Sequence, residues 1–387
     1  MVITAVEPLQ CAAGWATWTF ARIETNDGRV GYGECSDWQT PQALAGGIRD
    51  LAAIIVGQDP RRVVAIAADM AFQARQNPGG PLQKAVAGIE AALWDLKGQI
   101  LGASITDMLG GPTRDHIRLY WSHCGSYRSR HPKFLETPPI NSWEDLAQFG
   151  SEVSASGYTA LKTNPLRPGH PTYFARPLDK NLERHDLEII VRQIETFRES
   201  VGPNVDICLD LNFRFNPRAV IQIARALEPY DLLWLEYDSY DPDVLAYVRS
   251  SIQTPLCSAE NLTSIRDYAR FFAAGAMDVA MIDVAWNGIA QSLHIAELAA
   301  AHDVQVAPHN YYSHVSTFMC AHVAAAVSNL RIMETDVDSA PWRDDLVTNC
   351  PAIADGRLTV PTGPGLGTTL NEEVVAAHPP AYTLVEP

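Results

Sequence analysis

The sequence has no apolar run long enough to span a bilayer, and it has few basic residues for its 387-residue length. Its 29 lysines and arginines stand against 45 aspartates and glutamates, which gives a formal net charge of −16. A membrane span needs about 20 consecutive apolar residues, and nucleic-acid binding favours an excess of positive charge. We therefore expect neither a membrane nor a nucleic acid as partner. A small anionic substrate stays compatible, because a bound divalent cation reverses the local field.

Paired cysteine motifs are also missing. The seven cysteines are scattered, odd in number and without a CxxC pair. This pattern predicts reduced thiols in a cytoplasmic protein rather than a disulfide framework. The first residues, MVITAVEPLQ, alternate like a strand and lack the charged and apolar regions of a signal peptide.

What the sequence does contain is an ionisable residue at the end of six successive apolar runs. The runs are VDICLD, LLWLE, PLCSAE, VAMID, VQVAPH and LRIME, and they end at Asp210, Glu236, Glu260, Asp283, His309 and Glu334. Successive end residues are 26, 24, 23, 26 and 25 positions apart. An interval of about 25 residues suits one unit of a (β/α)₈ TIM-type barrel, in which strand ends converge on one mouth. We therefore expect these six side chains to share one site.

A single acid at such a position is more often a helix cap or a solvated loop residue. Six in phase are different, because a capping acid has no reason to occupy the last strand residue each time. The shared site is thus the stronger interpretation, provided that the strands form.

The fold class predicted is α/β, a (β/α)₈ barrel with an α+β capping domain. Residues 1–113 would form the capping domain, with a hairpin at Asn26-Asp27-Gly28 and a helical stretch that stops at Gly110-Gly111-Pro112. Residues 114–345 would form the barrel, and residues 346–387 a tail that returns to the capping domain. A long loop follows the second barrel strand, and we expect its His170 and Arg176 to be solvated.

The first three acids offer only hard oxygen donors. Asp210, Glu236 and Glu260 would lie on neighbouring strands, and such a set suits Mg²⁺, or Mn²⁺ in its place, rather than zinc. Without a cation the three carboxylates would repel and raise one another's pKa values.

The next two strands offer a base. Asp283 beside His309 would fix the imidazole tautomer and make the ring a stronger base. Glu334 would donate a proton or a hydrogen bond if its pKa is raised, and Lys162 on the second strand would meet the anionic end of a substrate. A metal, a base and a cation in one cavity suit removal of the proton next to a carboxylate, because metal and lysine stabilise the charge that develops.

These residues lie in segments that resemble the mandelate racemase branch of the enolase superfamily. The resemblance covers ARIETNDGRVGYGE, AGIEAALWDLKGQILGASITDMLGG, LDLN, WLEY, SAEN, MIDVAWNGI, APHN and VPTGPGLG. It implies Asp210, Glu236 and Glu260 as Mg²⁺ ligands. It further implies that His309 and Asp283 form the base dyad, with Glu334 near the enediolate.

At two positions the sequence differs from the motifs of that family, and these differences limit the reactions that we expect. Asn164 stands where the racemase has a second base, and an amide exchanges no proton at neutral pH, so a racemase or epimerase is disfavoured. The usual acid-acid-proline after the fourth strand is Glu236-Tyr237-Asp238 here. We predict a Mg²⁺-dependent dehydratase, a hydro-lyase acting on a sugar acid. The nearest alternative is a cycloisomerase of a sugar lactone or anhydro-sugar acid, and the remote ones are a hydrolytic metal barrel and a metabolite-binding barrel.

The substrate would be a small polyhydroxylated carboxylate. Its candidate contacts are Trp15, His123, Asn164 and Asn212, while Arg214 and Asn287 are polar residues near strand ends that could equally be structural. We also expect a homo-oligomer.

Overall fold

The structure is a computed structural model that describes residues 1–174 and 180–380, so Arg176 lies outside the described residues. The chain begins with an antiparallel three-stranded sheet in the order β1-β2-β3. Its strands are β1 (Ile3–Ala13), β2 (Ala16–Thr25) and β3 (Val30–Glu34), and the turn from Asn26 to Gly28 joins the last two. Four helices follow, namely α1 (Pro41–Ile55), α2 (Val63–Ala74), α3 (Gly80–Leu101) and α4 (Ile105–Met108).

Helix α3 packs against strand β3 at unusually close range. Apolar residues of this helix are fully buried, among them Ile89, Leu93 and Leu96. A Cβ added at Gly33 would lie 2.2 Å from the carbonyl oxygen of Gly88, so only glycine permits this approach of strand to helix. The GYG sequence of β3 is therefore explained by backbone contact with α3.

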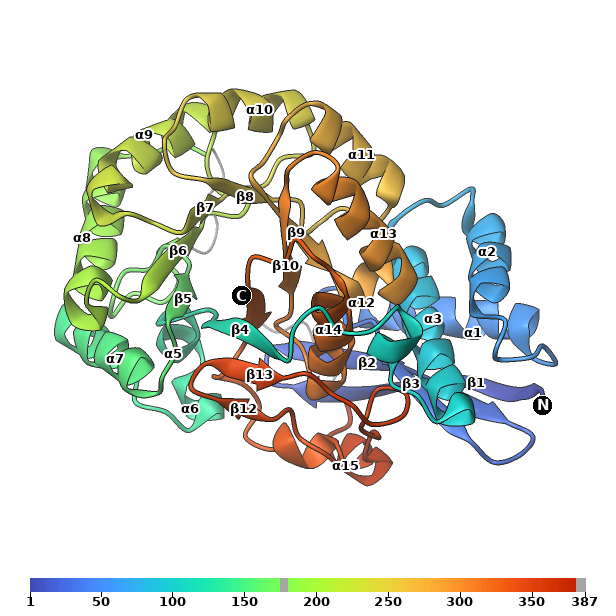
Figure 1. The fold of residues 1–387 in the computed structure, drawn as a ribbon. Helices are drawn as coiled ribbons and strands as arrows, with labels where there is room; N and C mark the ends of the chain where they lie inside the picture. Colours follow the sequence, from blue (N-terminus) through green and yellow to red (C-terminus); the bar gives the residue numbers. More distant parts are fainter. Residues whose placement is uncertain (175–179, 381–387) are drawn as a thin grey trace.

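Eight parallel strands form a barrel surrounded by helices (Figure 1). The strands are β4 (His116–Trp121), β5 (Ala160–Thr163), β6 (Asp206–Asp210), β7 (Trp234–Glu236), β8 (Leu256–Ser258), β9 (Val279–Asp283), β10 (Gln305–His309) and β11 (Met333–Thr335). Neighbours pair in chain order from β4 to β10, and β11 pairs with β4. The last gap, between β10 and the segment before β11, carries a single bridge from Val306 to Leu330. The predicted α/β barrel is thus confirmed.

Helices alternate with the barrel strands. The main ones are α7 (Trp143–Ala155), α8 (Arg184–Val201), α9 (Pro217–Leu227), α10 (Pro242–Ser250), α11 (Ile265–Ala273), α13 (Ile289–Ala300) and α14 (His314–Ala326). Short ones are α5 (Ser126–Arg130), α6 (Pro132–Leu135), α12 (Val284–Asn287), η1 (Glu228–Tyr230) and η2 (Asp344–Leu346). The barrel interior is filled by side chains such as Tyr120, Cys208, Trp234 and Met281, so it is a core and not a pore.

The strand register places paired site residues on the same face of the sheet. Asp210 is directly opposite Glu236 on the neighbouring strand, and Asp283 is directly opposite His309. Directly paired residues of adjacent strands point to the same face of a sheet, so each pair shares one side. Two strand ends differ from the prediction. Strand β8 ends at Ser258, two residues before Glu260, and Glu334 is the middle residue of β11 rather than its last.

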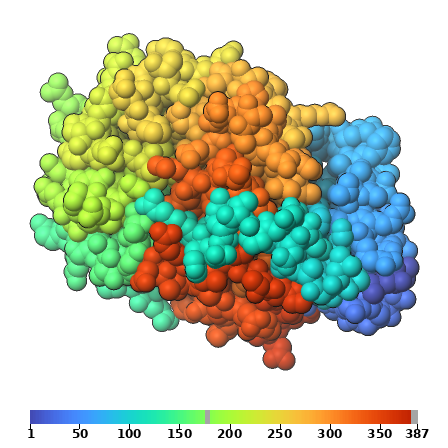
Figure 2. All heavy atoms as spheres, viewed as in Figure 1, coloured from blue at the N-terminus to red at the C-terminus, as the bar shows by residue number. Residues whose placement is uncertain are grey.

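The C-terminal segment contacts both parts of the molecule. Strand β13 (Arg357–Thr359) pairs with β12 (Ile353–Ala354) and, antiparallel, with the first half of β4. Helix α15 (Glu372–Ala377) begins at Glu372, whose Oε1 accepts hydrogen bonds from Arg22 Nε at 2.8 Å and Tyr32 Oη at 2.6 Å. Figure 2 shows these red residues against the teal start of the barrel. The domain boundaries at residues 113 and 345 stay predictions.

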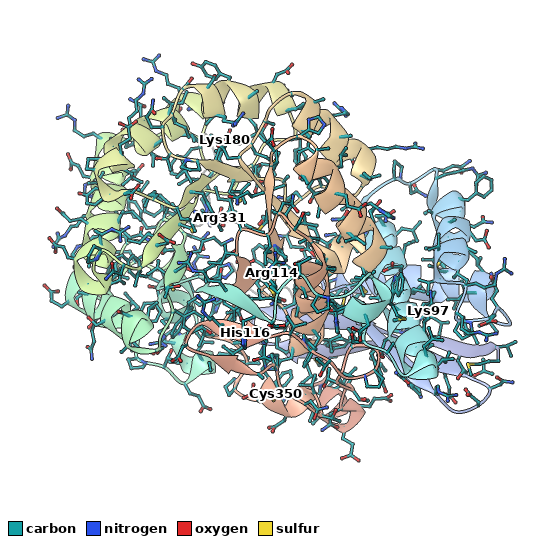
Figure 3. All side chains as sticks on the ribbon, viewed as in Figure 1. Lys97, Arg114, His116, Lys180, Arg331 and Cys350 are labelled. Atoms are coloured by element: carbon teal, nitrogen blue, oxygen red, sulfur yellow. The ribbon has the colours of Figure 1, made fainter. Side chains whose placement is uncertain are left out.

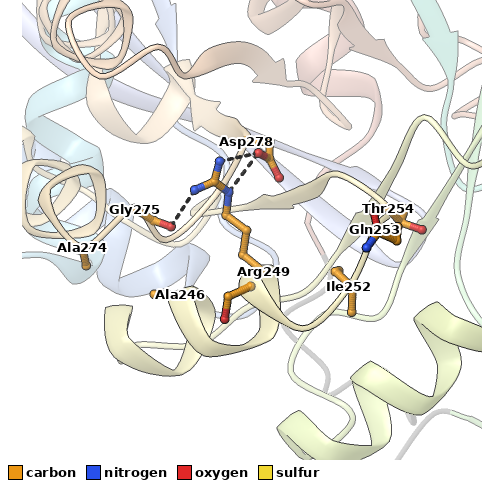
Figure 4. Close-up of a pocket in the computed structure, with 9 residues that line it drawn as sticks. Ala246, Arg249, Ile252, Gln253, Thr254, Ala274, Gly275 and Asp278 are labelled. Atoms are coloured by element: carbon orange, nitrogen blue, oxygen red, sulfur yellow. Dashed lines mark hydrogen bonds and ion pairs between the residues drawn. The ribbon is translucent and has the colours of Figure 1, made fainter.

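At the amino-terminal end of the barrel strands, side chains make structural contacts between neighbouring elements. Arg114, just before β4, donates to the carbonyl oxygens of Ala324 and Val327 and so caps the end of α14 (Figure 3). A surface hollow of about 430 Å³ lies between α10 and the segment before β9, where Arg249 bonds to Asp278 and Gly275 (Figure 4). These residues precede their strands, so the hollow lies at the amino-terminal end of the barrel.

All seven cysteines are free thiols, and Cys350 is the exposed one (Figure 3). Within the described ranges, every helix is too short or too polar to cross a bilayer.

Candidate active site

A buried histidine–aspartate pair lies at the carboxyl ends of β9 and β10. His309 Nδ1 is 2.7 Å from Asp283 Oδ2, and the aspartate is fully buried. Two more donors hold the same carboxylate, namely Tyr312 Oη at 2.6 Å on Oδ2 and the backbone N–H of Trp286 at 3.0 Å on Oδ1. Since the carboxylate accepts, Nδ1 carries the proton and Nε2 faces the other side-chain acids. The pair predicted from the sequence is therefore present in the geometry of a base and its orienting group.

The outer nitrogen of His309 lies among carboxylates. Its Nε2 is 3.3 Å from Glu260 Oε2 and 3.7 Å from Glu334 Oε2. Burial alone would lower the pKa of His309, but Glu334, Glu260 and Asp283 raise it to about 10. A base must be free of its proton, so this ring needs another cation to offset the negative charge around it.

Lys162 on β5 bridges two of the predicted acids. Its Nζ is 3.1 Å from Glu236 Oε2 and 3.1 Å from Glu334 Oε1. Burial opposes the charge of this lysine, but the two carboxylates raise its pKa well above the ordinary value. Lys162 is therefore an ammonium ion in the centre of the acid cluster.

Glu334 is an ionised acceptor. Its oxygens accept hydrogen bonds from Ser122 Oγ at 2.5 Å and from the N–H of Asn310 at 2.8 Å. Burial would raise the pKa of this carboxyl, but Lys162 and His309 hold it below the ordinary value. From the sequence we predicted that Glu334 donates a proton or a hydrogen bond if its pKa is raised. That condition is not met, because two cations stand beside it.

The three predicted metal ligands lie around the same cluster. Asp210 accepts from Asn164 Nδ2 at 2.9 Å, from Asn212 Nδ2 at 2.8 Å and from the Asn212 N–H at 2.7 Å. Burial raises the pKa of Glu236 well above its ordinary value, and Asp210 and Glu260 add to this rise against Lys162. Burial likewise raises the pKa of Glu260. The cluster is short of positive charge, as the sequence led us to expect.

The carboxylate oxygens are not gathered around one point in this arrangement. Among the described residues, the three strand-end acids do not form a set whose ligand atoms all lie within 4.8 Å of one another. The expected close approach is therefore absent, because Glu236 Oε2 is turned to Lys162 and Glu260 Oε2 to His309.

The donor set nevertheless fits a hard divalent cation. It consists of oxygens alone, which Mg²⁺ prefers. Glu236 Oε1 is also buried without a hydrogen-bond partner among the described residues, and an orphaned carboxylate oxygen is costly unless a cation or water meets it. Coordination of one ion by all three acids would require their carboxylates to lie closer together than they do here.

Asp238 is a residue whose part the sequence did not indicate. Its Oδ1 accepts from Ser258 Oγ at 2.9 Å and from the Ala259 N–H at 3.2 Å. Ala259 has φ +88°, a conformation that side chains other than glycine rarely adopt. Asp238 thus holds the strained residue that precedes Glu260. Burial, together with Glu260 and Asp210, raises the pKa of Asp238 to about 8.

The predicted substrate contacts fall into two groups. Asn164 and Asn212 both donate to Asp210, so their amide N–H groups hold the acid. His123 Nδ1 lies 2.9 Å from Asp336 Oδ1, and the His123 ring stacks on the Tyr127 ring with their centroids 4.1 Å apart. Trp15 comes from the turn between β1 and β2.

This tryptophan stacks on His131 at 4.3 Å and lies 4.5 Å from Tyr127. The first sheet therefore contacts the loops after β4, next to His123. Asn287 is structural, since it donates to the carbonyls of Leu262 and Asp283, and His170 is exposed, as expected.

Two family models match the chain. Residues 2–110 match the mandelate racemase / muconate lactonizing enzyme N-terminal domain, and residues 145–374 match the enolase C-terminal domain-like family. The chain belongs to the enolase superfamily. Within it, the match of the first domain places the chain with the mandelate racemase / muconate lactonizing enzymes, as its motifs predicted.

Solved structures and curated proteins resemble this superfamily member over nearly its whole length. A Burkholderia xenovorans protein, proposed to be an L-alanine-DL-glutamate epimerase and bound to magnesium and fumarate, is 38% identical with TM-score 0.94, covering 98% of this chain and 97% of its own. A Rubrobacter xylanophilus relative is 31% identical with TM-score 0.87, covering 97% of each chain. The D-gluconate dehydratase of Thermoproteus tenax is 29% identical, over 97% of this chain and 74% of its own. The D-galactonate dehydratase of Ralstonia nicotianae is also 29% identical, over 92% and 90%.

Proposed function

We propose that this superfamily member is a Mg²⁺-dependent dehydratase of a sugar acid. The observation that carries the proposal is the buried dyad, with His309 Nδ1 held 2.7 Å from Asp283 and its Nε2 directed into the acid cluster. The relatives named D-gluconate and D-galactonate dehydratase support the substrate class. The substrate would be a small carboxylate that carries a hydroxyl group on its β-carbon.

Asp210, Glu236 and Glu260 would hold the magnesium ion. When bound there, a magnesium ion would stabilise negative charge at the substrate carboxylate and would offset the acids that raise the pKa of His309. Two asparagines already orient Asp210 through hydrogen bonds. Asp238 holds the backbone before Glu260.

The protein groups would divide the remaining work. His309 takes the proton next to the carboxylate, while Asp283 and Tyr312 keep its tautomer and orientation. Lys162 adds a positive charge at the carboxylate oxygens, and the ionised Glu334 holds Lys162 in position. The hydroxide on the β-carbon would then leave as water with the proton that His309 has gained, since Lys162 and His309 hold the pKa of Glu334 below its ordinary value against burial.

Epimerisation needs a second group that can exchange a proton. At the position expected for it stands Asn164, whose amide nitrogen donates to Asp210. This disfavours a two-base epimerase, although one relative of similar fold is proposed to be one. A cycloisomerase shares the first proton abstraction and differs only in its leaving group. Product mass separates it from a dehydratase, because only dehydration loses water.

The test is His309→Asn, assayed with wild type against a library of acid sugars. We expect turnover to fall by about a thousandfold or more, because general-base catalysis contributes that order of rate. Magnesium binding, followed by calorimetry, should stay close to that of wild type. His185→Asn is the matched control, since His185 is an exposed histidine on α8.

Unchanged turnover in His309→Asn would refute the histidine as base. Wild type that consumes an acid sugar without loss of water would refute dehydration, and product of unchanged mass would favour the cycloisomerase. A hydrolytic metal site is excluded if solvent deuterium enters the carbon next to the carboxylate. Binding of acid sugars without any turnover would indicate a metabolite-binding barrel.

A further inference from the structure

The short helix α12 sets the direction of the carboxylate in the dyad. Asp283 caps this single turn, and its Oδ1 accepts from the Trp286 N–H at 3.0 Å. The other oxygen, Oδ2, faces His309 and Tyr312. A helix of one turn is not stable by itself, so α12 must be held by other parts of the fold. Whatever holds Trp286 therefore also directs the carboxylate of Asp283.

The indole of Trp286 is held by residues that precede the barrel. Its Nε1 donates to the carbonyl oxygen of Ser36 at 2.8 Å. Lys84 of α3 lies over the ring, with its Nζ 3.3 Å from the ring centroid, and the same Nζ donates to Asp37 Oδ2 at 2.7 Å. The side chains of Lys84, Asp37 and Trp286 are all buried. The indole is thus fixed both at its N–H edge and on its face.

The contact between Lys84 and the indole is close. In the described ranges, the other lysine and arginine groups that lie over a ring are 4.1 to 5.7 Å from its centroid. An ammonium group is attracted to the face of an aromatic ring, and tryptophan is the best such partner. A buried ion pair such as Lys84–Asp37 adds little stability compared with packed apolar side chains. Stability alone therefore does not account for this lysine, whereas the placing of the ring does.

Helix α3 is held against the same segment at a second point. Glu90, six residues after Lys84, accepts from the first two N–H groups of α13 at 2.8 and 3.0 Å. A Cβ added at Gly288, between α12 and α13, would lie 2.7 Å from Glu90 Oε2, so the helix and this segment approach closely. Lys84 therefore reaches Trp286 from a helix whose position beside α12 is fixed.

The indole also lies next to the base. The ring centroids of Trp286 and His309 are 6.3 Å apart, and the rings are inclined at 65° in an edge-to-face arrangement. Trp286 thus meets the dyad twice, through its main chain at Asp283 and through its ring at His309. Lys84 contacts the ring of Trp286, so its effect on the dyad would pass through that ring.

We propose that Lys84 is a positioning residue for the base. Held by Asp37, it clamps the indole of Trp286 and so keeps Asp283 directed at His309. This inference rests on the proposed function for the reaction that the dyad performs. It adds that the orientation of the base depends on a loop and a helix that precede the barrel, and not on the barrel strands alone.

The first test replaces the lysine. Lys84→Met removes the ammonium group and keeps an unbranched apolar chain. On the acid sugar that wild type converts fastest, we expect kcat to fall by about tenfold, the order for a desolvated cation–π contact, while KM stays unchanged. Lys97→Met is the matched control, since Lys97 lies on the same helix with its Nζ 4.7 Å from the Trp94 ring. This control should leave both constants at their wild-type values.

The loss should depend on the indole. In a Trp286→Leu background, Lys84→Met should cause no further fall in kcat, because the ring on which the lysine acts is gone. An equal fall in both backgrounds would overturn the proposal. A Lys84→Met protein with a lower Tm and wild-type kcat would also overturn it, since the contact would then serve stability alone.

A measurement without turnover follows the dyad itself. With isotope-labelled histidine, NMR identifies the Nδ1–H of His309 through its loss in His309→Asn. We expect this proton to exchange with solvent faster in Lys84→Met than in wild type, because Asp283 holds it less firmly, and Lys97→Met should keep the wild-type rate. If Lys84→Met does not fold, Trp286→Phe, which loses the bond to Ser36, is measured in the same way. An unchanged exchange rate in the variant measured would overturn the proposal.

Failure of the proposed function gives a different result. If wild type dehydrates no acid sugar, that function is wrong, and the exchange rate of the His309 proton still tests the positioning by Lys84. If wild type dehydrates an acid sugar and Lys84→Met equals it in kcat and in exchange rate, the function stands and the positioning role falls.

Discussion

At the scale of single residues, the dyad depends on a tyrosine that follows it in the chain. Asp283 Oδ2 accepts from both His309 and Tyr312, at 2.7 and 2.6 Å. Removing the hydroxyl leaves the buried carboxylate with one donor fewer and frees it to turn. A lost hydrogen bond to a charged group costs about 1.5–3 kcal/mol, which corresponds to a rate loss of roughly tenfold to a hundredfold.

We therefore expect Tyr312→Phe to lower kcat by that factor while KM changes little, because Tyr312 orients the base and is not expected to bind substrate. Steady-state kinetics on the best acid sugar measures both constants. Tyr240→Phe is the control, since Tyr240 is 72% exposed. A rise in KM at constant kcat would mean that Tyr312 binds substrate instead.

Several of these residues could be read from the sequence, and several could not. Asp283 and His309 were found because each ends an apolar run, and the period of the strands forces them to the same side. Glu260 was placed on a strand end but lies two residues beyond it, since the left-handed Ala259 is a backbone feature that residue types do not reveal. Tyr312 was missed because it lies in a loop, where no periodicity predicts direction.

Arg214 was identified only as an ambiguous polar residue. Its buried Nη1 has no hydrogen-bond partner among the described residues, and this depends on which groups the folded chain places nearby. The same holds for Asn164 and Asn212, whose shared hydrogen bonds to Asp210 join the loops after two strands.

At the scale of elements, one buried carboxylate joins the first sheet to the barrel. Glu34, the last residue of β3, accepts from the Ser313 hydroxyl at 2.5 Å and from the Ser316 N–H at 2.9 Å, at the N-terminus of α14. Ser36 Oγ and the Ser313 N–H donate to its other oxygen. Burial raises the pKa of Glu34, and the hydrogen bonds of Ser313, Ser36 and Ser316 act against this rise by favouring the carboxylate. The free N–H groups of a helix N-terminus favour this negative charge.

Glu34→Gln should reduce the free energy of unfolding by about 1–3 kcal/mol, because the amide presents a donor where a donor already points. Urea denaturation followed by far-UV circular dichroism measures it. Glu195→Gln on the exposed face of α8 serves as control. A midpoint equal to that of wild type would show that Glu34 is protonated and contributes no charge to this junction.

A neutral histidine connects α14 to the C-terminal segment. His322 Nδ1 accepts from the Thr106 N–H at 3.3 Å, and Nε2 lies 3.1 Å from the Leu366 carbonyl oxygen, so Nε2 carries the proton. Burial lowers the pKa of His322 to about 4, although the Leu366 carbonyl acts to raise it. The folded chain thus binds a second proton at this ring only below about pH 4, whereas the unfolded chain binds it below about pH 6.5.

The stability from His322 is therefore complete above pH 6.5 and is lost as the pH falls from 6.5 to 4, by about 3 kcal/mol in total. His322→Gln should show a shallower fall of Tm between pH 6.5 and 4.5 than wild type. Differential scanning calorimetry at several pH values measures the slope. His185→Gln, on an exposed histidine, should retain the wild-type slope. Equal slopes for all three proteins would contradict the assignment.

At the scale of the whole molecule, a divalent cation should stabilise the fold. The unfolded chain has no gathered carboxylates, so magnesium binds the folded state alone and shifts unfolding by mass action. At a hundredfold excess over its dissociation constant the gain is about 2.7 kcal/mol, or roughly 2–5 °C in Tm. Thermal melts across a magnesium titration measure it.

Asp210→Asn and Glu260→Gln should reduce the shift, and Glu195→Gln should not. If magnesium raises the Tm of all three variants equally, the cation binds elsewhere on this acidic surface. The predicted homo-oligomer stays a prediction that sedimentation can settle in the same samples.

The barrel as a whole was predictable because its strands repeat at a steady interval and their ends carry the chemistry. The pairing of the C-terminal segment with β4 was not, since β13 has three residues and no alternation to mark it. The path of the C-terminal segment along the barrel, rather than the sequence of β13, determines that β13 pairs with β4.

The pairing of β4 with β11 and β13 has a consequence for the chain during its synthesis. The first barrel strand has two neighbours on one side, β13 along its first half and β11 along its second, and both follow it in the chain by more than two hundred residues. During translation β4 therefore presents an open edge for more than two hundred residues, and such edges invite pairing between chains. A nascent chain released early would carry every proposed metal ligand and still lack the strands that close the ring around them.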